Sequence, residues 1–231
     1  FLADQRTRVN KKNPSKPISA ATIGNSRSAV KSTWDAISMD LISPMIASLT
    51  RLDPPKPRYD ELVDFSKILN LFKSWGSKNS LSEEQIRTKA IILFRLCSLQ
   101  RSDDLSKIPW ESVQFKKHKL TFTVERPKDS KYSEEGYIMR YNGLLHNCFC
   151  PVLSIQHWIE ISEKWRKNSN QDMLFISLKK PRTNLTSQRI AKIILETMEE
   201  AGINTEQFKA HSLRGAAAST AMREGASIDE I

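Results

Sequence analysis

A helical segment in the middle of the chain places the strongest constraint on the fold. It opens with two overlapping capping boxes, Ser80 with Glu83 and Ser82 with Gln85, which are typical of a helix N-terminus. Apolar side chains then recur at helical spacing. They are Ile86, Ala90, Leu93, Phe94 and Cys97. The pattern predicts a core helix, with Cys97 as one of its small buried hydrophobic residues.

The sequence after residue 58 combines further helical patterns with two strand patterns. Apolar residues at helical spacing mark residues 62–72, 151–165, 187–198 and 211–224. Alternating β-branched and aromatic residues mark strands at 119–125 and 136–141, joined by a hairpin loop. Residues 173–177 form a short apolar run, either a strand or an extended segment. We therefore expect a mainly α fold with a small antiparallel β-sheet (α+β).

A proline-rich segment divides the chain. Residues 53–58, with three prolines among four consecutive residues, predict a stiff extended linker. Before it, residues 1–52 combine a basic arm with a helical pattern that starts at Ser19. That piece is too small for a core of its own, so we expect it to belong to a helical domain that begins before Phe1. Residues 59–231 form the second predicted domain.

The charge of the chain indicates its class of partner, and its cysteine content indicates the cellular compartment. The net charge is +10 and the pI about 9.6, which points to a polyanionic partner. Residues 1–31 carry seven Lys or Arg and a single Asp, so an arm lying along a nucleic-acid backbone is one interpretation and a solvated face another. No apolar run reaches membrane-spanning length, and the start of the sequence is not a signal peptide. Three cysteines without framework spacing indicate a reducing compartment.

Two short motifs carry candidate chemistry. His211 and Arg214 lie three residues apart at the start of a helix rich in alanine, where an imidazole and a guanidinium can hold a phosphate. The alternative is a packed or capping histidine and an ordinary salt bridge. Arg101 follows the central helix, with Asp104 to hold its backbone or to form a surface pair with it. His146, Cys148 and Cys150 lack zinc-site spacing and a second cysteine pair, so we expect a turn there.

These motifs, in this order, resemble the catalytic domain of the tyrosine recombinase (phage integrase) superfamily. Residues 99–105, LQRSDDL, with Trp110 further on, are similar to the family's L-R-x-x-E-L-x-x-L-x-W box, with Asp104 at the acidic position. The second box, H-x-L-R-x-x-x-A-(S/T) with a later glycine, is matched by His211, Leu213, Arg214, Ala218, Ser219 and Gly225. The helix from Ser19 resembles the end of the family's helical core-binding domain. The linker and residues 150–152 look most like recombinases of eukaryotic DIRS and crypton elements.

The resemblance implies a role for each candidate residue. Arg101 and Arg214 would bind non-bridging oxygens of the scissile phosphate, and His211 would donate to that phosphate and help to deprotonate the nucleophile. Lys128, or as second choice Lys131, would protonate the departing 5′ oxygen. A tyrosine attacks in this family and leaves a 3′-phosphotyrosyl link, so the reaction needs no metal, cofactor or ATP. The implied partners are double-stranded DNA and, on DNA, a homotetramer, with neither a membrane nor a small-molecule substrate.

The sequence departs from the family pattern at the nucleophile. The family places a further His or Trp and then the tyrosine after Arg214, whereas Tyr59, Tyr132, Tyr137 and Tyr141 all precede it. We expect the 231-residue chain to end before the nucleophile, to bind DNA and not to form the covalent intermediate.

Several functions remain open at this point. The first is a recombinase that integrates a mobile element in the nucleus, or in the cytoplasm of a prokaryote. The second is a catalytically inactive DNA-binding protein derived from such an enzyme. A helical scaffold that binds RNA or acidic protein is a third hypothesis, and a type IB topoisomerase is a minor fourth.

Overall fold

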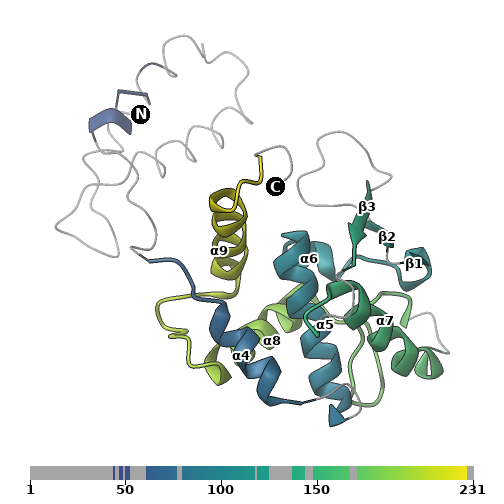
Figure 1. Ribbon diagram of the computed structural model, residues 1–231. Coiled ribbons are helices and arrows are strands. Elements are labelled where there is room, and N and C mark those ends of the chain that lie inside the picture. Colours follow the sequence, from purple (N-terminus) through teal and green to yellow (C-terminus); the bar gives the residue numbers. More distant parts are fainter. Residues whose placement is uncertain are drawn as a thin grey trace. The chain divides into compact units, whose positions relative to one another are not determined.

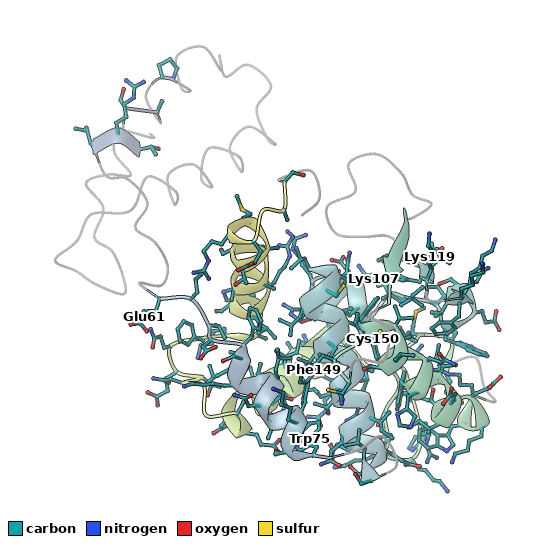
Figure 2. The ribbon with its side chains drawn as sticks, in the orientation of Figure 1. Glu61, Trp75, Lys107, Lys119, Phe149 and Cys150 are labelled. Atoms are coloured by element: carbon teal, nitrogen blue, oxygen red, sulfur yellow. The ribbon has the colours of Figure 1, made fainter. Side chains whose placement is uncertain are left out.

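The computed structural model describes residues 44, 47–48, 50–52, 61–76, 80–117, 119–124, 137–143, 148–166 and 171–227, with only the backbone of 137–142. Backbone contacts divide the chain into two compact units, residues 1–60 and 61–231. The few described residues of the first unit are helical. The predicted basic arm and the linker at 53–58 lie outside the described residues. The second unit begins at Glu61, which is labelled in Figure 2.

The predicted core helix is α5 (Glu83–Ser98), and it lies in the middle of the second unit (Figure 1). Of the two capping boxes, Ser82 with Gln85 forms: the Ser82 hydroxyl accepts the Gln85 N–H at 3.2 Å, and the Gln85 side chain accepts the Ser82 N–H at 2.9 Å. Ile91, Ile92 and Phe94 are completely buried. Helix α5 thus serves as the support on which the rest of the unit packs.

Four other helices of comparable length belong to this unit, one before α5 and three after it in the chain. They are α4 (Ser66–Ser74), α7 (Pro151–Ser162), α8 (Ser187–Glu200) and α9 (Ala210–Arg223). Local sequence explains their ends, because Pro151 occupies the first turn of α7 and the Thr186 hydroxyl accepts the Arg189 N–H at the start of α8. Helices α7, α8 and α9 all contact α5. In Figure 1, α8 and α9 lie on one side of α5, and α7 and the sheet on the other.

The sheet has three antiparallel strands in the order β1 (Gln114–Lys116), β2 (Lys119–Val124) and β3 (Tyr137–Asn142). Along β2 the side chains of Leu120, Phe122 and Val124 are buried, and the Phe122 ring meets Phe94 of α5 edge-on, with 4.9 Å between centroids. The two predicted strands are present with ends shifted by one residue. The third, β1, was not predicted, because three exposed residues are too few to show a strand pattern.

Two details correct the sequence-based expectations. Cys97 is exposed in the last turn of α5, although Ser98 and Gln100 close to it are buried, so it is not a core residue. The predicted helix over 151–165 stops at Ser162 and continues as one 3-10 turn, Glu163–Trp165. The apolar run at 173–177 forms isolated bridges, Pro109 with Met173 and Ile176 with Asn184. Within the described residues, the mainly α class with a small antiparallel sheet is confirmed.

Candidate functional site

Arg101 lies in a tight connection between α5 and a short helix, α6 (Ser102–Leu105). Helix α5 ends at Leu99, which adopts the left-handed conformation with φ 53° and so turns the chain away from the helix axis. Arg101 is the N-cap of α6, and its backbone N–H donates to Asp104 Oδ2 at 3.0 Å. Since Asp104 is only 5% exposed, its carboxylate fixes the Arg101 backbone from inside the protein rather than forming a surface pair.

His211 and Arg214 occupy the first turns of α9. The Ser212 hydroxyl accepts the Lys209 N–H at 3.1 Å, and Ser212 and Leu213 are buried, which fixes this end of the helix against the core. His211 is exposed and Arg214 half-buried. Arg214 Nε donates to the carbonyl of Leu99, 115 residues earlier in the chain. The Arg214 guanidinium therefore lies against the connection that carries Arg101.

Arg95 joins the same two segments from inside the protein. Its side chain is 2% exposed. Nη1 donates to Gln100 O at 3.1 Å and to Ser102 Oγ at 3.2 Å, on either side of Arg101, and Nη2 donates to Ala210 O at 3.2 Å. We call residues 95–104 together with residues 210–214 the α5–α9 junction. Hydrogen bonds from two arginines thus hold its halves together.

The junction carries an excess of positive charge. Burial, followed by the neighbouring Arg214 cation, lowers the pKa of Arg95 to about 10, and Asp104 acts in the opposite direction. Asp103 is paired with Lys107 at 2.7 Å, beside α6 (Figure 2). Asp104 thus remains as the carboxylate that offsets the cluster of Arg95, Arg101 and Arg214. Such a surplus favours an anion as the ligand.

Sequence reasoning identified Arg101, His211 and Arg214, and the structure brings the segments that carry them together. Lys128 and the second choice, Lys131, lie outside the described residues. Sequence reasoning missed Arg95, although a signal was present: it follows Ile91 by four residues and Ile92 by three, so it belongs to the apolar face of α5. A charged residue on a buried helical stripe requires a partner inside the protein.

Neither a metal site nor a membrane span emerges from the described part of the chain. No group of His, Cys, Asp or Glu side chains there is arranged to hold a metal ion. Cys150 is instead the N-cap of α7, where its sulfur accepts the Leu153 N–H at 3.5 Å. No helix within the described ranges is both long and apolar enough to cross a bilayer.

Comparison with known families decides the family. The model of the phage integrase family matches residues 62–231, which is most of the chain. The chain belongs to the phage integrase family. The match begins one residue after the start of the second compact unit and includes the whole α5–α9 junction. No curated protein sequence matches the chain.

Solved structures show that the fold is that of tyrosine recombinases. XerA recombinase superposes with a TM-score of 0.54 at 16% identity, covering 100% of this chain and 78% of its own. XerH site-specific recombinase, bound to its difH substrate in a pre-cleavage complex, gives a TM-score of 0.54 at 16% identity and covers 73% of this chain. A post-cleavage complex of XerH gives 0.51. The superposed region spans less than half of the XerH chain, 44% and 42% in the two complexes.

Proposed function

We propose that this phage integrase family member is a site-specific DNA recombinase, which cleaves and rejoins DNA through a 3′-phosphotyrosyl intermediate. Family membership and the tyrosine recombinase fold support the proposal. The observation that carries it is the tie across the α5–α9 junction, where Arg214 Nε donates to Leu99 O, two residues before Arg101. Two arginines distant in sequence thereby come from neighbouring stretches of backbone, which is what binding of a single phosphate by both would require.

In the proposed mechanism, Arg101, His211 and Arg214 form a phosphate clamp. The two guanidinium groups bind non-bridging oxygens of the scissile phosphate and stabilise the negative charge that grows on it during attack. His211 donates a hydrogen bond to the phosphate and assists removal of the proton from the attacking tyrosine. Lys128 protonates the departing 5′ oxygen, with Lys131 as the alternative.

The geometry of Arg214 suits this role. A guanidinium has five N–H groups in a planar fork, and Arg214 uses Nε to bond the Leu99 carbonyl. Among the residues that the structure describes, none accepts a hydrogen bond from its two terminal nitrogens. Arg214 can therefore be fixed by one edge of the fork and bind phosphate oxygens with the other.

The wider proposal concerns context. The proposed partner is double-stranded DNA; XerH, which shares the fold, is a site-specific recombinase solved in complexes with its difH substrate. The protein would act as a homotetramer on two sites, in the nucleus, integrating a mobile element of the DIRS or crypton type. A catalytically inactive DNA-binding protein that retains the clamp is the second candidate.

Removal of both clamp arginines tests the DNA-binding part of the proposal. We expect the double variant R101A/R214A to bind short duplex DNA at least about tenfold more weakly than the wild type, because charge-assisted hydrogen bonds contribute about 1.5–3 kcal/mol each. The slope of log affinity against log salt should fall by about one for the lost phosphate contact. Fluorescence anisotropy over a salt series measures both quantities.

The matched control is R189A/K192A, which removes the same charge from α8. Both side chains are exposed and pair with Glu196, at 3.4 and 3.8 Å, and neither belongs to the residues of the junction. This variant should keep the wild-type affinity within about twofold, since isolated surface pairs contribute little. If both double variants lose the same DNA affinity, the effect of Arg101 and Arg214 is one of general charge. That result would favour the scaffold hypothesis.

Covalent trapping tests the cleavage step. A duplex site is first selected from a random pool by the protein and then prepared with a nick that prevents religation. We expect the 231-residue chain to bind this duplex without forming an adduct, and any longer natural form with a tyrosine after Arg214 to form one. An adduct on the 231-residue chain would assign the nucleophile to an earlier tyrosine. Absence of an adduct from every form would favour the inactive DNA-binding protein.

A further inference from the structure

We propose that Arg95 is a positioning residue, which sets the separation between the two halves of the phosphate clamp without touching DNA itself. This inference rests on the proposed function and adds a residue that the family's two boxes do not include. At 2% exposure the Arg95 side chain is closed off from solvent, so it acts through the backbone groups that it holds.

The hydrogen bonds of Arg95 fit this role. Nη1 binds Gln100 O and Ser102 Oγ, which flank Arg101, while Nη2 binds Ala210 O, which precedes His211. The two terminal nitrogens belong to one rigid planar group, so their separation is fixed by covalent geometry. That fork therefore fixes the distance between the backbone at Arg101 and the backbone at His211. Lysine has one ammonium and would not hold both halves in the same way.

Arg95 also acts together with Arg214. Arg95 joins Gln100 to Ala210, and Arg214 joins α9 to Leu99, so successive carbonyls of the connection receive one arginine each. Both bonds span 115 residues of sequence. Loss of Arg95 would remove this link and place more of the connection on the hydrogen bond from Arg214 to Leu99 O, and Arg214 is needed for the phosphate.

A role limited to stability explains this arrangement poorly. Arg95 Nε and Asp104 Oδ1 are buried, and neither has a hydrogen-bond partner within the described residues. A buried guanidinium with an unpaired donor, beside the like charge of Arg214, is a costly way to stabilise a fold, because burial and the neighbouring cation offset part of what its hydrogen bonds contribute. What the arginine provides and a methionine cannot is the fixed link between the two segments.

The test is a set of variants at Arg95 compared with a matched variant at Arg166. R95M removes the fork and keeps the volume, and R95K keeps the charge. R166M is the control, because Arg166 also donates to backbone carbonyls, those of Gln171, Met173 and Leu174, but lies outside the junction. Each variant is measured for its melting temperature and for its affinity and salt slope on the selected duplex.

We expect R95M to bind the duplex about tenfold more weakly than the wild type while remaining folded, with R95K intermediate and R166M within about twofold of the wild type wherever it is folded. In an R101A/R214A background, R95M should add less than about twofold, because it acts through the clamp. If R95M does not fold, R95K decides by the same readout, as the fork is lost while the charge remains.

The outcomes separate this inference from the proposed function. If folded R95M binds the duplex with wild-type affinity, the role of Arg95 is overturned and the clamp stays intact. If R95M does not fold, wild-type affinity in R95K has the same meaning. A full additional loss of affinity for R95M in the R101A/R214A background also overturns it, because Arg95 would then act independently of the clamp. If R101A/R214A itself binds like the wild type, the clamp fails, and the role of Arg95 fails with it.

Discussion

Two arginines in this protein, Arg95 fully buried and Arg166 half-buried, use the same chemistry for different ends. Arg95 holds the α5–α9 junction, and Arg166 holds the loop at residues 171–174. Both donate to backbone carbonyls, and burial lowers the pKa of each to about 10. The second largest influence differs: the cation of Arg214 lowers the pKa of Arg95 further, whereas Asp172 and then Glu163 raise that of Arg166.

The partners differ in sequence separation as well. Arg166 bonds carbonyls five to eight residues away, and its guanidinium lies 5.1 Å from the centroid of the Trp110 ring. It therefore closes a local loop whose charge is balanced by carboxylates. Arg95 instead joins segments 115 residues apart and leaves a surplus of positive charge. A balanced buried cation indicates a structural role, and an unbalanced one beside further cations indicates a site for an anion.

The largest expected effect is the loss of stability in R166M. Gln171 O and Met173 O lose their donor, whereas Leu174 O keeps the Trp158 indole N–H at 2.7 Å. Loss of these two charge-assisted hydrogen bonds should lower the free energy of unfolding by about 3 kcal/mol or more. R95M should lose only about 1–2 kcal/mol, because removal of Arg95 also relieves the repulsion with Arg214. Urea denaturation of both variants measures the difference, and a larger loss in R95M would contradict the comparison.

The next effect is expected from R214K. Lysine keeps the positive charge, but its single ammonium cannot bond the Leu99 carbonyl and phosphate oxygens with the two edges of a fork. We expect the affinity for duplex DNA to fall about tenfold, close to the loss in R214A. R189K on α8 is the control and should bind as the wild type does. Retention of wild-type affinity in R214K would mean that charge alone matters at this position.

The smallest expected effect is that of D104N. Asparagine can still accept the Arg101 N–H, but the negative charge that raises the pKa of Arg95 is lost, so that pKa should fall further. We expect the free energy of unfolding to fall by about 1 kcal/mol and the DNA affinity to stay within about threefold. Urea denaturation and anisotropy measure the two. If D104N were more stable than the wild type, the penalty for burying the Asp104 carboxylate would exceed the stabilisation that it gives to the junction.

Much of the fold could be predicted because its signals are local. The spacing of apolar residues and a capping box define α5, and the alternation from Leu120 to Val124 defines β2. Strand β1 could not be predicted, since its three exposed residues pair with β2 mainly through backbone groups, which every residue has. The exposure of Cys97 could not be predicted either, because spacing gives the face of a helix but not which positions a neighbouring element covers.

The candidate site divides in the same way. Arg101, His211 and Arg214 could be proposed from two short motifs and their order, since the family's chemistry requires those residue types. Arg95 could not, although its place on an apolar helical face hinted at a buried partner. Its three acceptors are a hydroxyl and two backbone carbonyls, which every residue has, so no residue type marks them in the sequence.

The sequence by itself determined which segments form helices and strands, the family to which the chain belongs, and the residue types available to bind a phosphate. These properties depend on neighbours within one or two turns or on the order of motifs. Only the tertiary structure decided that Arg95 and Arg214 join the end of α5 to the start of α9. That contact spans 115 residues, and its geometry exists only once the helices have packed around the core.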